Sequence, residues 1–185
     1  MTIFRTINGI KHFIYVIRDN FSRAILACQA SAVYNSDIAR QTLESVLQKF
    51  DLLKQSGSLI TDDGAENQGE LTKWLASSAT LWKKIVAQVD IIQSNSMVEA
   101  ANKIIKYRYL FPKPIMDTSE LIKTLELAVE NYNNMPNGQL HGFTPDEVLT
   151  GTIPDKHFFK SKIQKAKQDR IATNRKVACD QVCQT

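Results

Sequence analysis

Apolar and polar residues alternate along the first thirty positions, a pattern typical of half-buried β-strands. Two β-rich segments, 2–7 and 12–17, flank the dipeptide Asn8-Gly9. This dipeptide favours a hairpin, because both of its residues tolerate the positive φ that a two-residue turn requires. A third apolar segment, 24–28, follows after a short polar turn. The N-terminal part therefore predicts three strands in an antiparallel meander.

Helical spacing of apolar residues begins after position 35. Leu43, Val46, Leu47 and Phe50 recur three and four positions apart, which predicts an amphipathic helix. We expect Ser36 and Asp37 to cap this helix and Gly57 to end it. Downstream, we predict strands at 58–61 and 85–87, and helices at 67–77, at 95–110, from Asp117 to about Tyr132, and from Thr144 to about Gly151. This order predicts an α/β domain with a mixed sheet and helices on both of its faces.

The composition is that of an ordinary globular protein, but the charge is uneven. Among 185 residues, 43% are hydrophobic and 23% are charged, with a net charge of +4. Residues 1–150 hold 15 basic and 16 acidic side chains, whereas residues 151–185 hold 8 basic and 3 acidic ones. A basic tail suits a polyanionic partner, although runs of like charge also occur on segments that are merely solvated.

Several protein classes are excluded or disfavoured by pattern. The longest apolar runs, such as 13–17, are too short to span a bilayer, and the N-terminal residues lack a signal-peptide pattern. We therefore expect a cytoplasmic protein with no membrane partner. Three cysteines without a Cys-x-x-Cys pair form neither a disulfide framework nor a zinc ribbon. We interpret Cys179 and Cys183, four positions apart, as free thiols.

Two acidic residues stand out by their context. Asp62 directly follows the predicted strand 58–61, and ligands of open α/β sheets bind at the carboxyl ends of strands. Asp-Asp-Gly is also a common turn sequence, so a turn role is the alternative. Glu99 shares one helix face with Asn95, Lys103 and Lys106. The alternative for that face is a solvated surface with a stabilising Glu–Lys pair.

Taken together, four sequence blocks resemble the catalytic core of retroviral integrases and of related bacterial insertion-sequence transposases. The blocks occur in family order, and they are Tyr15–Arg23, Ile60–Glu66, Asn95–Lys106 and the segment from Tyr132 to Leu149. The resemblance implies a ribonuclease-H-like mixed five-stranded sheet, with three antiparallel strands followed by parallel ones. It also implies a catalytic core at 1–151 and a basic C-terminal extension at 152–185.

The resemblance assigns roles to individual residues. Asp62 matches the second member of the family's Asp-Asp-Glu triad and Glu99 the third, with 36 residues between them. Both would be catalytic metal ligands, while Asn95, Lys103 and Lys106 would contact DNA. Two Mg²⁺ ions (or Mn²⁺) about 4 Å apart can activate the nucleophile and stabilise the leaving oxygen of a phosphodiester, and Mg²⁺ prefers hard oxygen ligands. The implied function is cleavage and joining of double-stranded DNA by a bacterial homo-oligomer.

The match is incomplete at the first carboxylate. The family has an Asp two positions before a Thr on the first strand, and Thr2 matches that Thr, so the Asp would fall immediately before Met1. Asp19 belongs to a different block, and we expect it to cap a turn. Two explanations remain open: a sequence that starts inside a longer transposase, or a decayed copy of a mobile element. Both predict weak metal binding and impaired DNA joining.

The sequence also departs from the family pattern at a few other positions, and alternative functions remain open. Met135 and Asn137 stand where the family often has Arg and His, and Ala100-Ala101 replaces its Arg-Phe. These departures weaken the expectation of DNA contacts in the last block, from Tyr132 to Leu149. The alternative function is a non-catalytic nucleic-acid-binding remnant that keeps the fold. A ribonuclease H proper shares the fold but lacks the block that begins at Tyr132.

Overall fold

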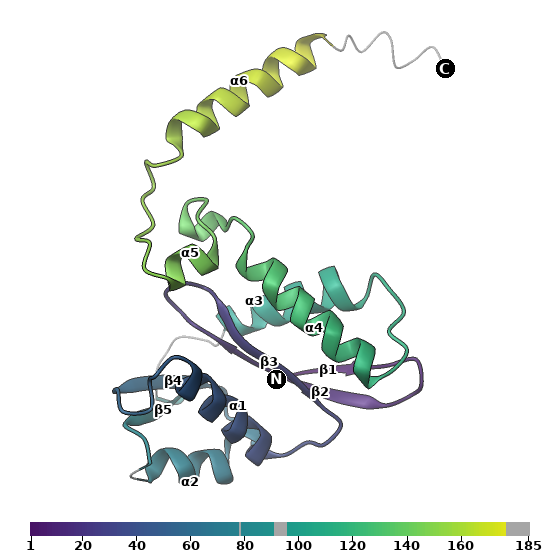
Figure 1. Cartoon of the computed structure of the whole chain (residues 1–185), viewed down its shortest axis with the longest axis vertical. Helices are drawn as coiled ribbons and strands as arrows, with labels where there is room; N and C mark the ends of the chain where they lie inside the picture. Colours follow the sequence, from purple (N-terminus) through teal and green to yellow (C-terminus); the bar gives the residue numbers. More distant parts are fainter. Residues whose placement is uncertain (78, 91–95, 177–185) are drawn as a thin grey trace. The chain divides into compact units, whose positions relative to one another are not determined.

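The computed structural model describes residues 1–77, 79–90 and 96–176. The chain divides into two compact units, Met1–Asn133 and Asn134–Thr185, and the predicted mixed α/β class is observed in the first (Figure 1). None of the described helices is both long enough and apolar enough to cross a membrane.

The N-terminal meander forms as the alternating pattern predicts. Strands β1 (Thr2–Arg5), β2 (Lys11–Arg18) and β3 (Ile25–Ser31) make an antiparallel sheet in the order β1-β2-β3. Gly9 adopts a φ of 88° in the hairpin between β1 and β2, a conformation that glycine reaches without steric cost. Asp19 caps the next turn as expected, because its Oδ2 accepts hydrogen bonds from the backbone N–H and the hydroxyl of Ser22 at 2.6 and 2.7 Å.

The single five-stranded sheet that the resemblance implies is not observed. Strands β4 (Gly57–Thr61) and β5 (Trp82–Val86) pair in parallel with each other and form a separate two-stranded sheet. Strand β1 is four residues long and pairs with Lys11–Ile14 of β2. Within the described part of the chain, the second half of β2 pairs with β3 alone.

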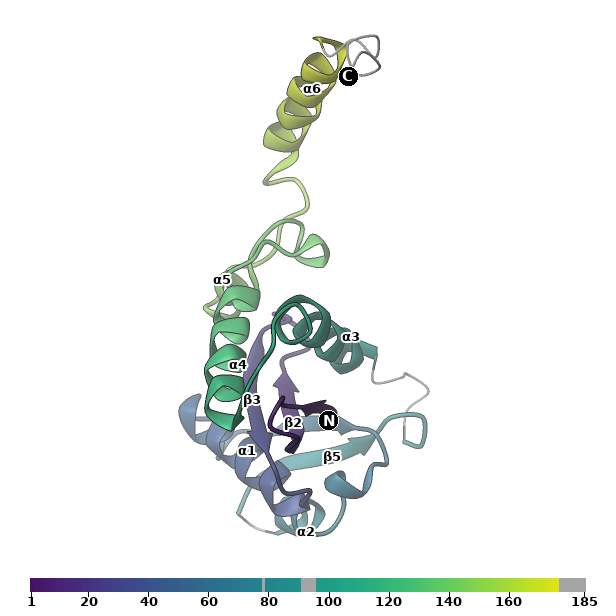
Figure 2. The ribbon, with the colours of Figure 1, turned by 90° about the vertical axis from the view of Figure 1, so that its right-hand side faces the viewer.

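Two hydrophobic cores pack on opposite faces of β2, because successive side chains of a strand point to opposite sides. Ile14 and Val16 join the core under α3 (Ser96–Ile104) and α4 (Thr118–Asn133). Ile17 packs against the core that includes Leu43 and Leu47 of α1 (Ser36–Lys49) and two leucines of α2 (Glu70–Ala76). Figure 1 shows α1 on one side of the three strands and α4 on the other, and Figure 2 shows the same elements turned by 90°.

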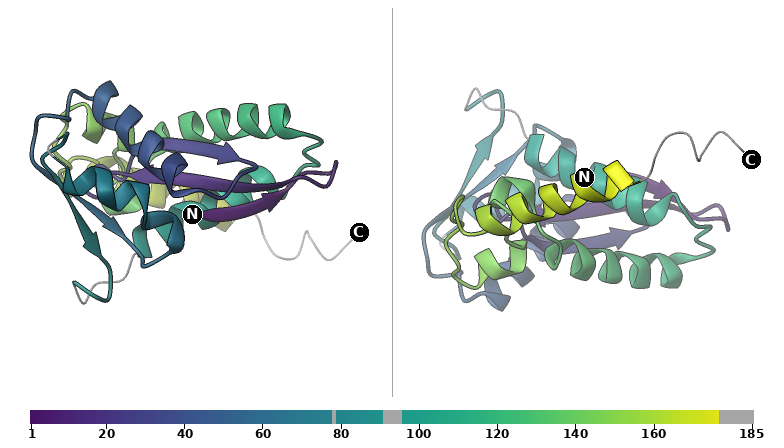
Figure 3. Two further views of the ribbon diagram at one scale, coloured as in Figure 1. Left: turned by 90° about the horizontal axis from the view of Figure 1, so that it is seen from below. Right: turned by 90° about the horizontal axis from the view of Figure 1, so that it is seen from above.

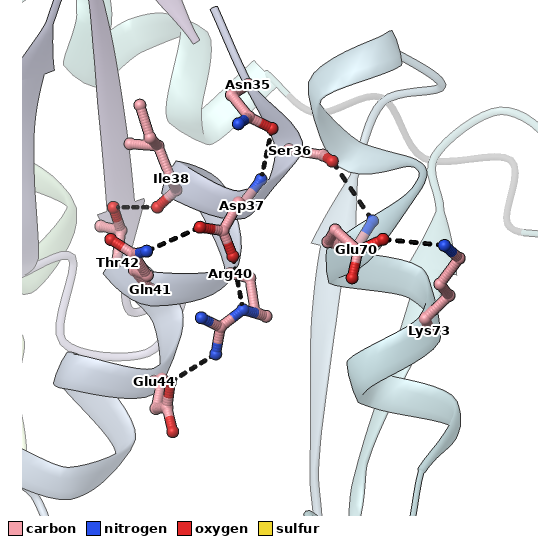
Figure 4. Close-up of polar contacts among 10 residues, drawn as sticks. All are labelled: Asn35, Ser36, Asp37, Ile38, Arg40, Gln41, Thr42, Glu44, Glu70 and Lys73. Carbon is pink, nitrogen blue, oxygen red and sulfur yellow. Dashed lines mark hydrogen bonds and ion pairs between the residues drawn. The ribbon is translucent and has the colours of Figure 1, made fainter. Parts of the chain in front are cut away.

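The two helices α1 and α2 are joined where they begin (Figure 4). The N-cap of α1 is Asn35, one residue before the predicted cap, and its side chain accepts a hydrogen bond from Asp37 N at 3.0 Å. The Ser36 hydroxyl instead accepts from the backbone N–H of Glu70, the first residue of α2, at 3.2 Å. Gly69 precedes Glu70 with a φ of 62°, and a Cβ there would lie 2.8 Å from the Ser36 hydroxyl, so glycine is required.

The predicted helix at 95–110 is a continuous helical segment over its described residues. It consists of α3 and a π-helical stretch at Ile105–Leu110. The π-helical stretch ends before Pro112 and Pro114, because proline lacks the backbone N–H that a continuing helix needs. The next helix, α4, begins after Asp117, whose side chain accepts from Glu120 N at 2.9 Å. This bond is the cap that the Asp117–Glu120 spacing predicts.

The described part of the second unit contains the α-helices α5 and α6, the short 3₁₀ helix Gly138–Leu140 and a small apolar cluster. Helix α5 (Pro145–Leu149) begins with a capping box in which Thr144 and Glu147 exchange side-chain and backbone hydrogen bonds, as the sequence predicts. Leu140, Phe143 and Val148 form the cluster, against which Phe159 packs. Helix α6 (Lys160–Lys176) carries much of the basic charge of the C-terminal extension.

A test of the fold concerns Asn133, the last residue of α4. Its side-chain amide donates to Ile25 O at 3.0 Å and accepts from Ile25 N at 2.9 Å, so it pairs with β3 as a neighbouring strand would. Asn133→Asp removes the donor and should lower the free energy of unfolding by roughly 1–3 kcal/mol. Urea denaturation measures this change.

Asn8→Asp provides the matched control. Asn8 acts through its Oδ1 atom, which accepts from Thr6 Oγ1 and Ile10 N, and aspartate keeps that acceptor. We expect the control to change stability by less than about 0.5 kcal/mol. Equal losses in the two variants would contradict a specific role of Asn133 in pairing with β3.

Candidate functional site

A cavity of about 210 Å³ lies within the first unit, between the end of β2 and strand β4. Its apolar lining includes Leu43, Val46 and Leu47 of α1. Its polar lining includes Arg18, Asp19, Asn20, Asp62 and Asn67. The cavity therefore combines apolar side chains with a group of charged and amide side chains, the composition expected of a binding site.

Asp62 lies directly beyond β4, at its carboxyl end, as the sequence predicts. Its side chain is exposed, and its Oδ1 accepts hydrogen bonds from Asn67 Nδ2 at 2.7 Å and from Gly64 N at 3.3 Å. The turn role that the Asp-Asp-Gly sequence suggested is therefore present. The same contacts hold the carboxylate in place at the edge of the cavity.

Glu99 and its neighbouring lysines lie on α3 and its π-helical continuation. Glu99 and Lys103 are exposed and Lys106 is half-buried, whereas Ala101 and Ile105 are fully buried. The predicted division of this helix into a polar and a core-facing side is therefore correct. Asn95, the fourth residue predicted for the polar face, lies outside the described residues.

The structure brings the Asp62 and Glu99 blocks to the same cavity. Val98, the residue immediately before Glu99, lines that cavity together with Asp62. Lys103 and Lys106 do not line it. Asp62 thus lines the cavity directly, whereas Glu99 is not among the lining residues and only follows one of them in the sequence. The pairing of the two carboxylates in one site stays a prediction.

Arg18 connects three of the sequence blocks through its guanidinium group. Its Nη1 donates to Met97 O at 2.5 Å, its Nη2 donates to the Tyr132 hydroxyl at 2.8 Å, and its Nε donates to Arg23 O at 3.0 Å. Burial lowers the pKa of Arg18, an effect that the nearby Tyr132 opposes. The sequence marked these blocks as functional, and the structure shows that Arg18 and Tyr132 hold them together.

Glu66 is a buried carboxylate that the sequence analysis did not single out, and it is not among the residues that line the cavity. It lies in the short 3₁₀ helix Ala65–Asn67 and is only 7% exposed. Its Oε2 accepts from the Tyr34 hydroxyl at 3.0 Å, and its Oε1 lies 3.9 Å from the Met1 ammonium group. A Cβ on Gly64 would lie 2.5 Å from Glu66 Oε2, so a larger residue there would displace this carboxylate. No local sequence signal marks Glu66, because its partners Tyr34 and Met1 are distant in sequence.

The described residues do not fit a two-metal site by themselves. Over residues 1–77, 79–90 and 96–176, no group of three or more His, Cys, Asp or Glu side chains is placed to hold a metal ion. Asp62 and Glu99 could each supply oxygen ligands, but Glu66 is engaged with Tyr34 and Met1. A site built from these two carboxylates would need further ligands to hold a pair of Mg²⁺ ions.

Comparison with known proteins identifies the fold. No protein-family model and no curated protein sequence matches this chain. A chain of the simian T-cell lymphotropic virus intasome, solved by electron cryomicroscopy in complex with the PP2A regulatory subunit B56 gamma, matches 79% of this chain with a TM-score of 0.61 and 19% identity. The catalytic core domain of BIV integrase matches 90% of this chain and 95% of its own length, with a TM-score of 0.52 and 19% identity.

These matches support the predicted fold at a coarse level. This chain spans 50% of the intasome chain. At 19% identity the likeness concerns the fold, which is that of a retroviral integrase core and fits the ribonuclease-H-like class. The more specific likeness to bacterial transposases and the Asp-Asp-Glu motif stay predictions from the sequence.

A pH titration tests the Tyr34–Glu66 contact. The hydrogen bond to Glu66 raises the pKa of the Tyr34 hydroxyl above its ordinary value, and desolvation acts in the same direction. When the pKa of a phenol is higher in the folded than in the unfolded state, its hydrogen bond contributes fully to stability below the unfolded-state pKa of about 10. That contribution to the free energy of unfolding is lost as the pH rises through the folded-state pKa. We expect Glu66→Gln to shift the Tyr34 titration back toward lower pH.

Phenolate absorbance measures this shift. The Tyr34 signal is isolated by subtracting the titration of Tyr34→Phe, recorded in the same glutamate or glutamine background. Tyr15 serves as an internal comparison, because burial is the main cause of its raised pKa and Glu66→Gln should move it less. A Tyr34 titration that is unchanged by Glu66→Gln would show that the contact does not control this hydroxyl.

Proposed function

We propose that this chain is an integrase-like domain that acts on double-stranded DNA. The observation that carries the proposal is that two sequence blocks reach one cavity of an integrase-type fold: Asp62 at the carboxyl end of β4, and Val98 of α3, the residue before Glu99. The implied reaction class is cleavage and joining of phosphodiesters, as in DNA integration or transposition.

In this proposal Asp62 and Glu99 are two of the metal-binding carboxylates, and further ligands would be needed to complete a two-metal site. Divalent ions bound there would supply activation of the attacking oxygen and stabilisation of the leaving oxygen. The chain's own contribution is positional, because Asn67 and Gly64 fix the Asp62 carboxylate and the buried Ala101 and Ile105 fix the rotation of the helix that carries Glu99.

Lys103 and Lys106 are the proposed phosphate contacts, together with Asn95. Lys103 is exposed, and the Lys106 ammonium lies 5.7 Å from the centre of the Phe111 ring. Both lysines follow Glu99 along the same helical segment, so they extend a cationic surface away from the carboxylates. Such a surface would bind DNA through its backbone and would not read sequence. A homo-oligomeric assembly and a bacterial cytoplasmic location are further proposals from the sequence.

The alternative is a nucleic-acid-binding module without catalysis. The observation that favours it is the turn contact of Asp62, whose carboxylate already accepts two hydrogen bonds from its own loop. A carboxylate used in this way has a structural role that does not require a metal. The two functions differ in DNA joining and agree in DNA binding.

One test of the proposed function concerns DNA binding. Changing Lys103 and Lys106 together to alanine should weaken binding to duplexes of unrelated sequence by similar factors. It should also lower the slope of log K against log salt by up to about 2, since each phosphate contact contributes roughly 0.9. Fluorescence anisotropy at several salt concentrations measures both effects.

A matched control uses Lys49 and Lys54, which are exposed lysines at and beyond the end of α1. Their double alanine variant has the same net charge as the test variant. An unchanged salt slope in the test variant, or an equal change in the control, would reject a specific phosphate role for Lys103 and Lys106.

Another test of the proposed function concerns the joining of DNA ends. With Mg²⁺ or Mn²⁺, we expect this chain to join a labelled DNA end to a target duplex near background level, because two carboxylates are too few for the metal pair. A gel-based strand-transfer assay measures the product. Robust joining that Asp62→Asn abolishes would contradict the expected impairment and establish catalysis. DNA binding without joining would leave the non-catalytic alternative in place.

A further inference from the structure

Two aromatic side chains, Tyr107 and Phe111, form an exposed aromatic surface at the end of the helical segment that starts with α3. Tyr107 is 70% exposed and Phe111 is 52% exposed. Their rings meet edge to face with a centroid distance of 5.2 Å, and the ring of Phe4 lies 6.2 Å from that of Phe111. Neither Tyr107 nor Phe111 lines the cavity. Contiguous apolar surface of this kind marks a contact site for a ligand or partner.

The π-helical stretch explains why these rings face outward. Ile105 and Leu110 are its first and last residues, and both are fully buried in the core under α3 and α4. A π-helix bonds residue i to residue i+5, so two residues five positions apart both face the core. The four residues between them, 106–109, are left on the outer side of the widened turn, and none of those four is buried.

The aromatic surface stands on a fixed backbone. Phe111 N donates to Lys106 O at 2.8 Å, which closes the last turn, and Ile7 N donates to Ile115 O at 2.9 Å. In both views of Figure 3, the teal-green segment that leads into α4 lies beside the purple hairpin of β1 and β2, as this second bond requires. A platform that is already rigid loses little conformational freedom when it binds.

Cations surround the aromatic surface. The sequence between Glu99 and Asp117 has four basic residues and no acidic one; the basic residues are Lys103, Lys106, Arg108 and Lys113. Lys106 Nζ lies 5.7 Å from the centre of the Phe111 ring, and Arg108 Cζ lies 5.9 Å from the centre of the Tyr109 ring. Lysine is depleted at protein–protein interfaces. Surfaces that bind single-stranded nucleic acid, in contrast, combine aromatic rings for the bases with cations for the backbone.

We propose that Tyr107 and Phe111 form a stacking site for unpaired nucleobases, and that its occupant is single-stranded DNA. A base stacks on the exposed face of Tyr107, and the adjoining phosphates lie along the basic side chains. The choice of DNA rests on the proposed function, whose phosphate contacts Lys103 and Lys106 belong to the same helical segment. The stacking goes beyond that function, because the bases of a duplex are already stacked on one another. The site accepts any base, since every base has a π-face.

The experiment compares two fluorescein-labelled single strands of about 12 nucleotides, a length within the site sizes of such surfaces. One strand is oligothymidine, and the other is an abasic strand with the same number of phosphates. The test variants of the full chain are Tyr107→Leu and Phe111→Leu. Leucine keeps the apolar bulk, which a docking site for protein tolerates, but it removes the aromatic face on which a base stacks.

Phe21→Leu is the matched control, because Phe21 is a similarly exposed aromatic residue (68%) in the turn between β2 and β3. Tyr107→Trp is the rescue variant, since it restores an aromatic face at the same position. Fluorescence anisotropy at several salt concentrations gives the affinity and its salt dependence for each strand.

We expect each leucine variant to bind oligothymidine more weakly by at least about fivefold, because stacking on an aromatic side chain contributes to the affinity for every base. The slope of log K against log salt should stay unchanged, since the phosphate contacts remain. The abasic strand should bind equally to all variants, which also shows that the leucine variants are folded. Tyr107→Trp should bind oligothymidine at least as tightly as the original chain.

The proposal is overturned if the original chain binds no single strand, or if both leucine variants bind oligothymidine as well as it does. Equal losses for oligothymidine and the abasic strand, or an equal loss in Phe21→Leu, would also reject a stacking site at Tyr107 and Phe111. The proposed function fails by a different result, namely duplex binding that does not depend on Lys103 and Lys106. The two failures are therefore distinguishable.

Discussion

The arrangement of the first unit depends on the hydrogen bonds that the Arg18 guanidinium group donates. This group lies at the end of β2 and donates to a backbone carbonyl at the start of α3, to a hydroxyl near the end of α4 and to the turn after β2. Burying a cation is costly unless its donors are satisfied, so the three acceptors must stay in place. Asp62 is positioned separately by β4, and the cavity is where these two parts of the unit meet.

Strand β2 transmits this constraint to both hydrophobic cores. Ile14 and Val16 pack against α3 and α4, while Ile17 packs against the α1–α2 core. A shift of β2 by one residue would exchange these faces and would also remove Arg18 from its acceptors. Asn133 of α4 opposes such a shift indirectly. It pairs with the backbone N–H and C=O of Ile25 and so fixes β3, the strand with which β2 pairs. The register and the polar contacts therefore reinforce each other.

Local features were predictable from the sequence, and long-range ones were not. The Asn8-Gly9 hairpin, the Asp19 turn and the Thr144 capping box each depend on residues within four positions of one another, so their chemistry is visible in the sequence. The separation of β4 and β5 from the main sheet is a matter of pairing between strands that are distant in sequence, which composition and local pattern cannot show. Glu66 was missed for the same reason, because its partners Tyr34 and Met1 are distant in sequence.

Asp62 shows that a structural and a chemical role need not exclude each other. An ionised carboxylate offers about four acceptor positions on two oxygens, and the described turn contacts engage one oxygen, Oδ1. The amide of Asn67 and the backbone of Gly64 restrict the rotation of the side chain. A ligand or metal would then meet a carboxylate whose orientation is already set, and groups that fix a ligating side chain in this way strengthen binding. The turn sequence that argues against function in isolation is, at the edge of this cavity, a means of supporting it.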